Sequence, residues 1–175
     1  MNRSKGFTLL ELLVVLVMIG IILGMAVLSL GDGGRRDRIR QEGQRIAILF
    51  NLLSQEAVLN SAEYGVLLKP DGYGFLHFID GEWQPLEKDS LLVERDLPED
   101  MELSLYMDKV NVSLEPQLLG ENETNKIKPQ LIFFSSAERT PFELEITYRD
   151  PPELRQQIDG PLLGDVLWQR ENTEQ

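Results

Sequence analysis

The N-terminal segment contains one charged side chain within a long apolar run. Glu11 is the only charged residue in the stretch 7–30. A carboxylate about one helical turn inside a membrane-embedded helix costs about 2.5–3.5 kcal/mol, so it needs a partner or a function. Lys5 is six residues away, off the i+3 and i+4 spacings at which helical side chains pair. The sequence therefore indicates that Glu11 finds its partner on another molecule.

Cleavage of the chain would create such a partner. If the peptide bond after Gly6 is cut, Phe7 gains a free α-amine at the start of the apolar helix. The amine of a neighbouring copy can then pair with Glu11. With such a cut, an intersubunit ion pair between Phe7 and Glu11 would set the axial register of two subunits.

The length of the apolar run predicts a transmembrane helix over residues 7–30. As a helix it would be about 36 Å long at 1.5 Å per residue, against a hydrocarbon core of about 30 Å. A secretory signal peptide has a shorter apolar region, of about 7–15 residues. A simple N-terminal membrane anchor is the alternative. Arginines and lysines flank the run on both sides, so the positive-inside rule leaves the orientation open.

The N-terminal residues resemble the class III signal of type IV prepilins and type II secretion pseudopilins. Gly6, Phe7 and Glu11 match that signal residue by residue. The resemblance implies that prepilin peptidase removes residues 1–6 and that the new N-terminus, Phe7, is methylated. It also implies that Glu11 guides subunits into a helical filament. The chain would cross the inner membrane once, with a cytoplasmic N-terminus and a periplasmic head.

Residues 31–60 are expected to form a hinge followed by a periplasmic amphipathic helix. Three of the four residues 31–34 are glycine, and each weakens a helix by about 1 kcal/mol relative to alanine, so a kink or an unwound segment is predicted there. Apolar residues then recur at helical spacing and place one face against a core. They are Ile39, Ile46, Phe50, Leu53 and Ala57.

Residues 61–175 are predicted to form a β-rich head, which makes the fold class α+β: a long N-terminal helix packed on an antiparallel β-sheet. Aromatic and β-branched runs separated by turn residues indicate strands, and the segment 121–126 is expected to be an exposed loop. The predicted strands are Tyr64–Lys69, Tyr73–Ile79, Glu82–Leu86, Glu102–Met107, Val110–Leu114, Leu131–Phe134, Phe142–Tyr148 and Val166–Gln169.

Segments of the head narrow the resemblance to the H-type minor pseudopilins of type II secretion. They are Tyr64–Val66, Asp71–Tyr73, Trp83–Leu86 with Leu97-Pro98, and Pro129–Ser136 running into Glu138–Leu144. One departure is Ala137, where relatives often have glycine before the glutamate. If this turn requires a positive φ, alanine carries a steric penalty there, or the turn adopts another type.

The head offers little for catalysis, metal binding or nucleic-acid binding. Cysteine is absent and His77 is the only histidine, so a zinc site is not expected; alternation makes His77 a half-exposed strand residue. No cofactor is predicted, and a metal site built from distant acids stays open. From residue 45 onward, 25 acidic residues against 11 basic ones give a net charge of −14, which opposes phosphate binding.

Taken together, the residues and the resemblance predict a non-enzymatic structural subunit. The resemblance implies a place near the tip of a periplasmic pseudopilus that helps export folded proteins through the outer-membrane secretin. The implied partners are the major pseudopilin, other minor pseudopilins, prepilin peptidase and the inner-membrane assembly platform, with exoproteins or the secretin as further candidates. Two alternatives stay open: a minor pilin of a type IV pilus, for adhesion or DNA uptake, and a membrane-anchored periplasmic binding module that does not polymerise.

Overall fold

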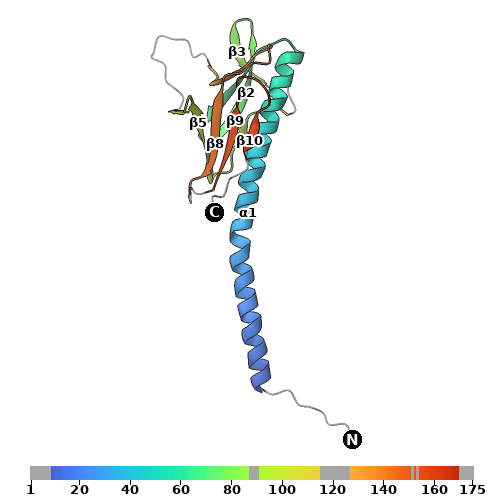
Figure 1. Ribbon diagram of the computed structural model, residues 1–175, viewed down its shortest axis with the longest axis vertical. Helices are drawn as coiled ribbons and strands as arrows, with labels where there is room; N and C mark the ends of the chain where they lie inside the picture. The colour runs from blue at the N-terminus through green and yellow to red at the C-terminus, as the bar shows by residue number, and fades with distance from the viewer. Residues whose placement is uncertain (1–8, 87–90, 115–126, 151, 153, 170–175) are drawn as a thin grey trace. The chain divides into compact units, whose positions relative to one another are not determined.

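The computed structural model describes residues 9–86, 91–114, 127–150, 152 and 154–169, with backbone alone for residues 25–33 (Figure 1). The chain divides into two units, Met1–Arg38 and Ile39–Gln175. We describe each unit by itself. The predicted division into a leader of residues 1–6, a transmembrane helix 7–30, a hinge with an amphipathic helix 31–60 and a head 61–175 stays a prediction.

One helix, α1, runs from Leu9 to Leu59. Its backbone is helical through residues 31–34, so of the two predicted alternatives the unwound segment is wrong and the kink stays a prediction. Glycine lowers helix propensity, but propensity is a weak term that context overrides. Once a helix is nucleated, each further residue adds a hydrogen bond for little additional ordering, so regular helix on both sides favours continuation.

The second unit begins with the residues of α1 that form the core. The five predicted core residues of the helix, Ile39, Ile46, Phe50, Leu53 and Ala57, are each at most 1% exposed, which confirms the helical pattern. Phe50 lies at the centre of an aromatic cluster, with ring centroids 5.7–6.4 Å from those of four other rings in edge-to-face geometry. These rings belong to Tyr73, Phe75, Phe133 and Phe142.

The end of α1 has the hydrogen-bond pattern of a Schellman motif. The amide of Ala62 donates to the carbonyl of Ala57 at 3.1 Å, and the amide of Ser61 donates to that of Val58 at 3.3 Å. Such a motif places the residue after the cap in the left-handed region, usually as glycine. Here Ser61 takes that place, with φ of 49°, and the chain turns directly into the first strand.

After α1, the described residues of the second unit form two antiparallel sheets of five strands. The first has the order β3-β2-β1-β7, with β4 also paired to β2, and the second has the order β10-β9-β8-β5-β6. Core residues from α1 and from both sheets form one hydrophobic cluster. The strands are β1 (Tyr64–Lys69), β2 (Gly72–Ile79), β3 (Glu82–Pro85), β4 (Arg95–Asp96), β5 (Met101–Met107), β6 (Val110–Val112), β7 (Leu131–Phe133), β8 (Phe142–Tyr148), β9 (Arg155–Gly160) and β10 (Leu167–Gln169).

All eight predicted strands are present, with boundaries that differ by at most two residues, but the pattern missed two strands. β4 is only two residues long. β9 has the sequence Arg-Gln-Gln-Ile-Asp-Gly, in which Ile158 is the single apolar side chain. It is nevertheless an inner strand, paired with both β8 and β10. The predicted loop 121–126 lies outside the described residues.

Candidate functional site

Glu11 lies in the first turn of α1 and is exposed to solvent. The amide groups at the start of a helix carry a partial positive charge that stabilises a nearby carboxylate. Gly6 and Phe7 lie outside the described residues, so cleavage, methylation and the ion pair stay predictions. Because Glu11 is exposed in the first helical turn, a cationic group at the terminus of a neighbouring helix could pair with its carboxylate.

The N-terminal part of α1 is apolar on every side. Each large apolar side chain from Leu9 to Leu23 is between 43% and 86% exposed in the chain alone. A continuous apolar surface of this kind marks contact with protein or membrane. Within the described residues, no helix has both the length and the apolar character needed to cross a membrane.

In the second unit, an asparagine joins α1 to the last strand. The side-chain amide of Asn51 donates to the carbonyl of Val166 at 2.9 Å, and its oxygen accepts from the amide of Val166 at 2.8 Å. The carboxamide thus makes the two hydrogen bonds that the backbone of a neighbouring strand would otherwise make to Val166, the residue before β10. These bonds link positions 115 residues apart, so the sequence pattern gave no signal for them.

Trp168 forms a second contact between α1 and β10. An added methyl group at Gly43 of α1 would lie 3.0 Å from the indole ring, so glycine allows the helix and the strand to approach closely. The indole Nε1 donates to Oε1 of Gln156 at 2.8 Å. The guanidinium carbon of Arg40 lies 5.3 Å from the ring centroid. These contacts hold the C-terminal strand against the helix.

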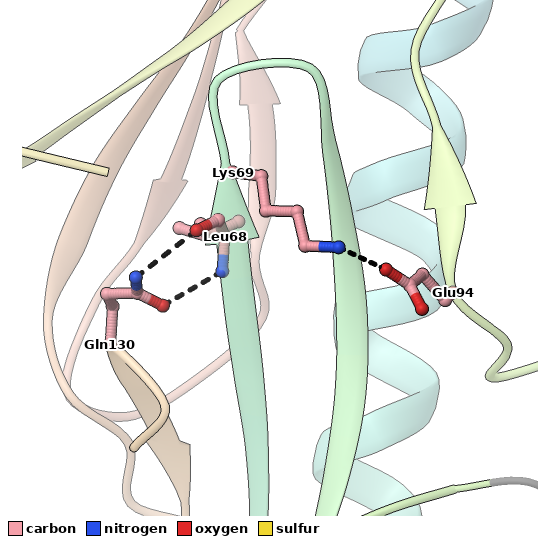
Figure 2. A network of polar contacts seen from close by, with 4 residues as sticks. All are labelled: Leu68, Lys69, Glu94 and Gln130. Carbon is pink, nitrogen blue, oxygen red and sulfur yellow. Dashed lines mark hydrogen bonds and ion pairs between the residues drawn. The ribbon is translucent and has the colours of Figure 1, made fainter. Parts of the chain in front are cut away.

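A second carboxamide closes part of the first sheet (Figure 2). β7 pairs with β1 only from Tyr64 to Val66, which would leave the backbone of Leu68 unpaired on that side. The side chain of Gln130 accepts from the amide of Leu68 at 2.8 Å and donates to its carbonyl at 3.2 Å. Because unpaired strand backbone can pair with another chain, Gln130 protects this edge.

Lys69, next to Leu68, forms an ion pair with Glu94 (Figure 2). The hydrogen bond to the Glu94 carboxylate is the main reason why the pKa of Lys69 lies above its usual value. Both side chains are at least 40% exposed, and solvent screens such pairs. We interpret the contact as structural: it orients the segment before β4.

The turn after β7 has the strained geometry considered for Ala137. Its φ is 70°, in the left-handed region that favours glycine. The amide of Ala137 donates to the carbonyl of Phe134 at 3.1 Å, and the amide of Phe134 donates to that of Glu138 at 2.9 Å. Those two bonds hold alanine in this conformation.

The described residues contain no group of three or more His, Cys, Asp or Glu side chains that could hold a metal ion. His77 is half-buried, as expected, and stacks on Tyr64 of the paired strand, with ring centroids 4.7 Å apart and an interplanar angle of 8°. The hydroxyl of Tyr64 accepts a hydrogen bond from Asn60 at 3.0 Å. The geometry of His77 is that of a packing residue.

Comparison with known proteins identifies the family. The Prokaryotic N-terminal methylation motif matches residues 1–27. The type II secretion system protein H of Pseudomonas aeruginosa is 39% identical over 155 residues, which cover 86% of this chain and 87% of that protein. The chain belongs to the type II secretion system protein H family. The protein H of Aeromonas hydrophila is 29% identical over 85% of this chain and 84% of that protein.

Solved structures of protein H relatives share the fold. A crystal structure of the minor pseudopilin EpsH of Vibrio cholerae has a TM-score of 0.64 at 24% identity, covering 77% of this chain and 97% of that one. The solution structure of GspH of Escherichia coli has a TM-score of 0.59 at 16% identity, covering 82% and 97%. The predicted resemblance to H-type minor pseudopilins is therefore confirmed, as is the α+β fold class.

Proposed function

We propose that this protein H family member is a structural subunit near the tip of the periplasmic pseudopilus. Residues 7–30 anchor it in the inner membrane, and its head lies in the periplasm. It joins other minor pseudopilins to the major pseudopilin, and the filament helps export folded proteins through the outer-membrane secretin. The observation that carries this proposal is the exposed apolar helix with Glu11 in its first turn, within a matched N-terminal methylation motif.

Assembly uses chemistry created by processing. Prepilin peptidase removes residues 1–6 and leaves the α-amine of Phe7, which is methylated and stays cationic. Pairing between that amine and the Glu11 carboxylate of a neighbouring subunit offsets the cost of placing each charge in an apolar environment. A subunit with an unprocessed N-terminus lacks the cation at this position. Cleavage thereby controls when the chain can enter a filament through the inner-membrane assembly platform.

The function of the head is recognition, not catalysis. The helix contains the features shared by all subunits of such a filament, so the identity of each subunit must come from its head. In this chain Asn51 and Trp168 hold the second sheet against α1 through the backbone of Val166 and the residues of β10. A head held in this way keeps its binding surface at a constant position relative to residues 39–59 of α1, which belong to the same unit.

The experiment is a Glu11→Ala substitution in the full-length chain, with Leu12→Ala in the same turn as the matched control. Glu11→Ala should still enter the membrane, measured by resistance to alkaline extraction. Its cross-linking to the major pseudopilin should fall at least tenfold, and secretion should fall with it. Leu12→Ala should behave like the unmodified chain. Normal secretion by Glu11→Ala would contradict the proposed function.

A further inference from the structure

The outer face of the second sheet has a row of side chains that crosses four strands. The strand register places Tyr106 of β5 opposite Glu143 of β8, Glu143 opposite Asp159 of β9, and Asp159 opposite Leu167 of β10. The residues that alternate with them, such as Leu105, Leu144 and Ile158, are fully buried in the core. We call the four outer residues the acidic row.

The two acidic residues of the row, Glu143 and Asp159, lie directly opposite each other in paired strands. Like charges directly opposite each other in paired strands are destabilising. The carboxylate of Asp159 accepts a hydrogen bond from the side-chain amide of Gln157 at 2.8 Å. It accepts another from the side-chain amide of Gln169. Neither Glu143 nor Asp159 takes part in an ion pair within the described part of the chain. An arrangement that opposes folding suggests that the pair serves a partner.

The same face is hollowed beside this row. A cavity of about 390 Å³ is lined by all four residues of the row, together with Lys109 from the turn between β5 and β6 and with other residues of the same end. Leu167 is 56% exposed. Three acidic residues line the cavity, since Asp108 joins the two of the row, against the single cation of Lys109. With an aromatic ring and an exposed aliphatic side chain beside these acids, the cavity suits a long basic side chain with an apolar stem.

The outer face of the first sheet, unlike that of the second, is partly covered by side chains of the same chain. An added methyl group at Gly65 of β1 would lie 2.6 Å from Pro129 and 3.0 Å from Trp83. The ring of Trp83 also lies 5.0 Å from that of Phe78. Side chains of the same chain thus cover this part of the first sheet, whereas the acidic row is open.

We propose that the acidic row binds a segment of a neighbouring pseudopilin head that contains a lysine or an arginine. This inference rests on the proposed function. The basic group lies between Glu143 and Asp159, and its stem packs between Tyr106 and Leu167. Charge disfavours three other occupants. A second copy would present the same acidic face within a head whose net charge from residue 45 onward is −14, and anionic lipids and nucleic acids would be repelled as well.

The test uses the full-length chain co-expressed with the pseudopilins of its own secretion system. The variant is Glu143→Gln with Asp159→Asn, which keeps side-chain size and removes both charges. The matched control is Asp96→Asn with Glu99→Gln, which removes the same charge from positions outside the acidic row. The readouts are the amount of each pseudopilin that co-purifies from membranes at low and high salt, and the melting temperature of the chain.

We expect the Glu143/Asp159 variant to recover at least tenfold less of one neighbouring pseudopilin at low salt than the control does. The difference should shrink at high salt, where charge pairs are screened. The melting temperature of this variant should equal or exceed that of the unmodified chain, because the repulsion is relieved. A merely structural role for the pair would instead lower the melting temperature and the recovery together.

Other results would overturn the proposal. If the variant and the control recover equal amounts while Glu11→Ala recovers none, the acidic row is not the binding face and the filament function stands. If the variant keeps every pseudopilin but loses a cross-linked exported protein, the proposed occupant is wrong. If the unmodified chain recovers no pseudopilin, the proposed function fails together with this inference.

Discussion

The carboxamide of Asn51 forms both backbone hydrogen bonds that a paired strand would give Val166, at 2.9 and 2.8 Å. Asn51 lies on α1 and Val166 directly precedes β10, so this side chain fixes the backbone at the entrance to β10 against the helix. Val166 is 3% exposed, and its backbone groups therefore have little access to water. The position of β10, and of the outer face beside it, depends on this contact.

Asn51→Ala should lower the free energy of unfolding by about 1–3 kcal/mol, because it leaves a buried amide and a buried carbonyl without partners. Urea unfolding of the full-length chain in detergent, followed by tryptophan fluorescence, measures this loss. Gln55→Ala, one turn further along the helix at an exposed position, is the control and should stay within about 0.5 kcal/mol. Equal stability of the two variants would contradict the role given to Asn51.

Tyr73 should make stability depend on alkaline pH. Burial, together with the nearby charge of Glu42, raises the pKa of Tyr73 from 10.0 to about 12. The phenol ionises more easily in the unfolded chain, so its contribution is fully present below pH 10 and is lost as the pH rises toward 12. Two pKa units correspond to about 3 kcal/mol. The unmodified chain should therefore lose stability over this range.

Tyr73→Phe tests this pH dependence. The Tyr73 hydroxyl is buried and forms no hydrogen bond within the described part of the chain, so phenylalanine should be neutral or stabilising at pH 7. Between pH 10 and 12, the stability of Tyr73→Phe should fall less steeply than that of the unmodified chain. Tyr106→Phe, on the half-exposed outer face, is the control. If the free energy of unfolding fell equally with pH in all three proteins, the fold would not raise the pKa of Tyr73.

Ala137→Gly should stabilise the protein by about 1 kcal/mol. A left-handed residue with a Cβ costs about 1–2 kcal/mol, and the greater freedom of glycine in the unfolded chain offsets part of that gain. Urea unfolding measures the change. Ala47→Gly in the middle of α1 provides the opposite case and should destabilise, because glycine is unfavourable in a helix. A loss of stability in both variants would show that the φ of Ala137 is not strained.

Processing makes a separate prediction about Phe7. Mass spectrometry of the protein isolated from cells with active prepilin peptidase should find a chain that begins at methylated Phe7. Substituting Gly6 by a bulky residue, as in Gly6→Val, should leave the leader in place and prevent assembly with the major pseudopilin. A mature chain that still begins at Met1 would contradict the class III signal.

The sequence by itself determined the features that depend on neighbouring residues. Apolar residues at helical spacing predicted the buried face of α1 from Ile39 to Ala57, because periodicity reports directly which side chains one element can bury. Aromatic and β-branched runs bounded by turn residues predicted the bounds of β1 and β8. The signal formed by Gly6, Phe7 and Glu11 is also local. It identified the superfamily, and the family comparison then confirmed the H type.

Tertiary structure alone decided what depends on residues far apart in the chain. β9 contains one apolar residue and is an inner strand only because β8 and β10 pair with it on both sides. The helix through residues 31–34 is continuous although three glycines disfavour it. The bonds of Asn51 to Val166 and of Gln130 to Leu68 exist because folding brings those backbones beside a free carboxamide. The acidic row forms for the same reason, since strand register sets which charges face each other.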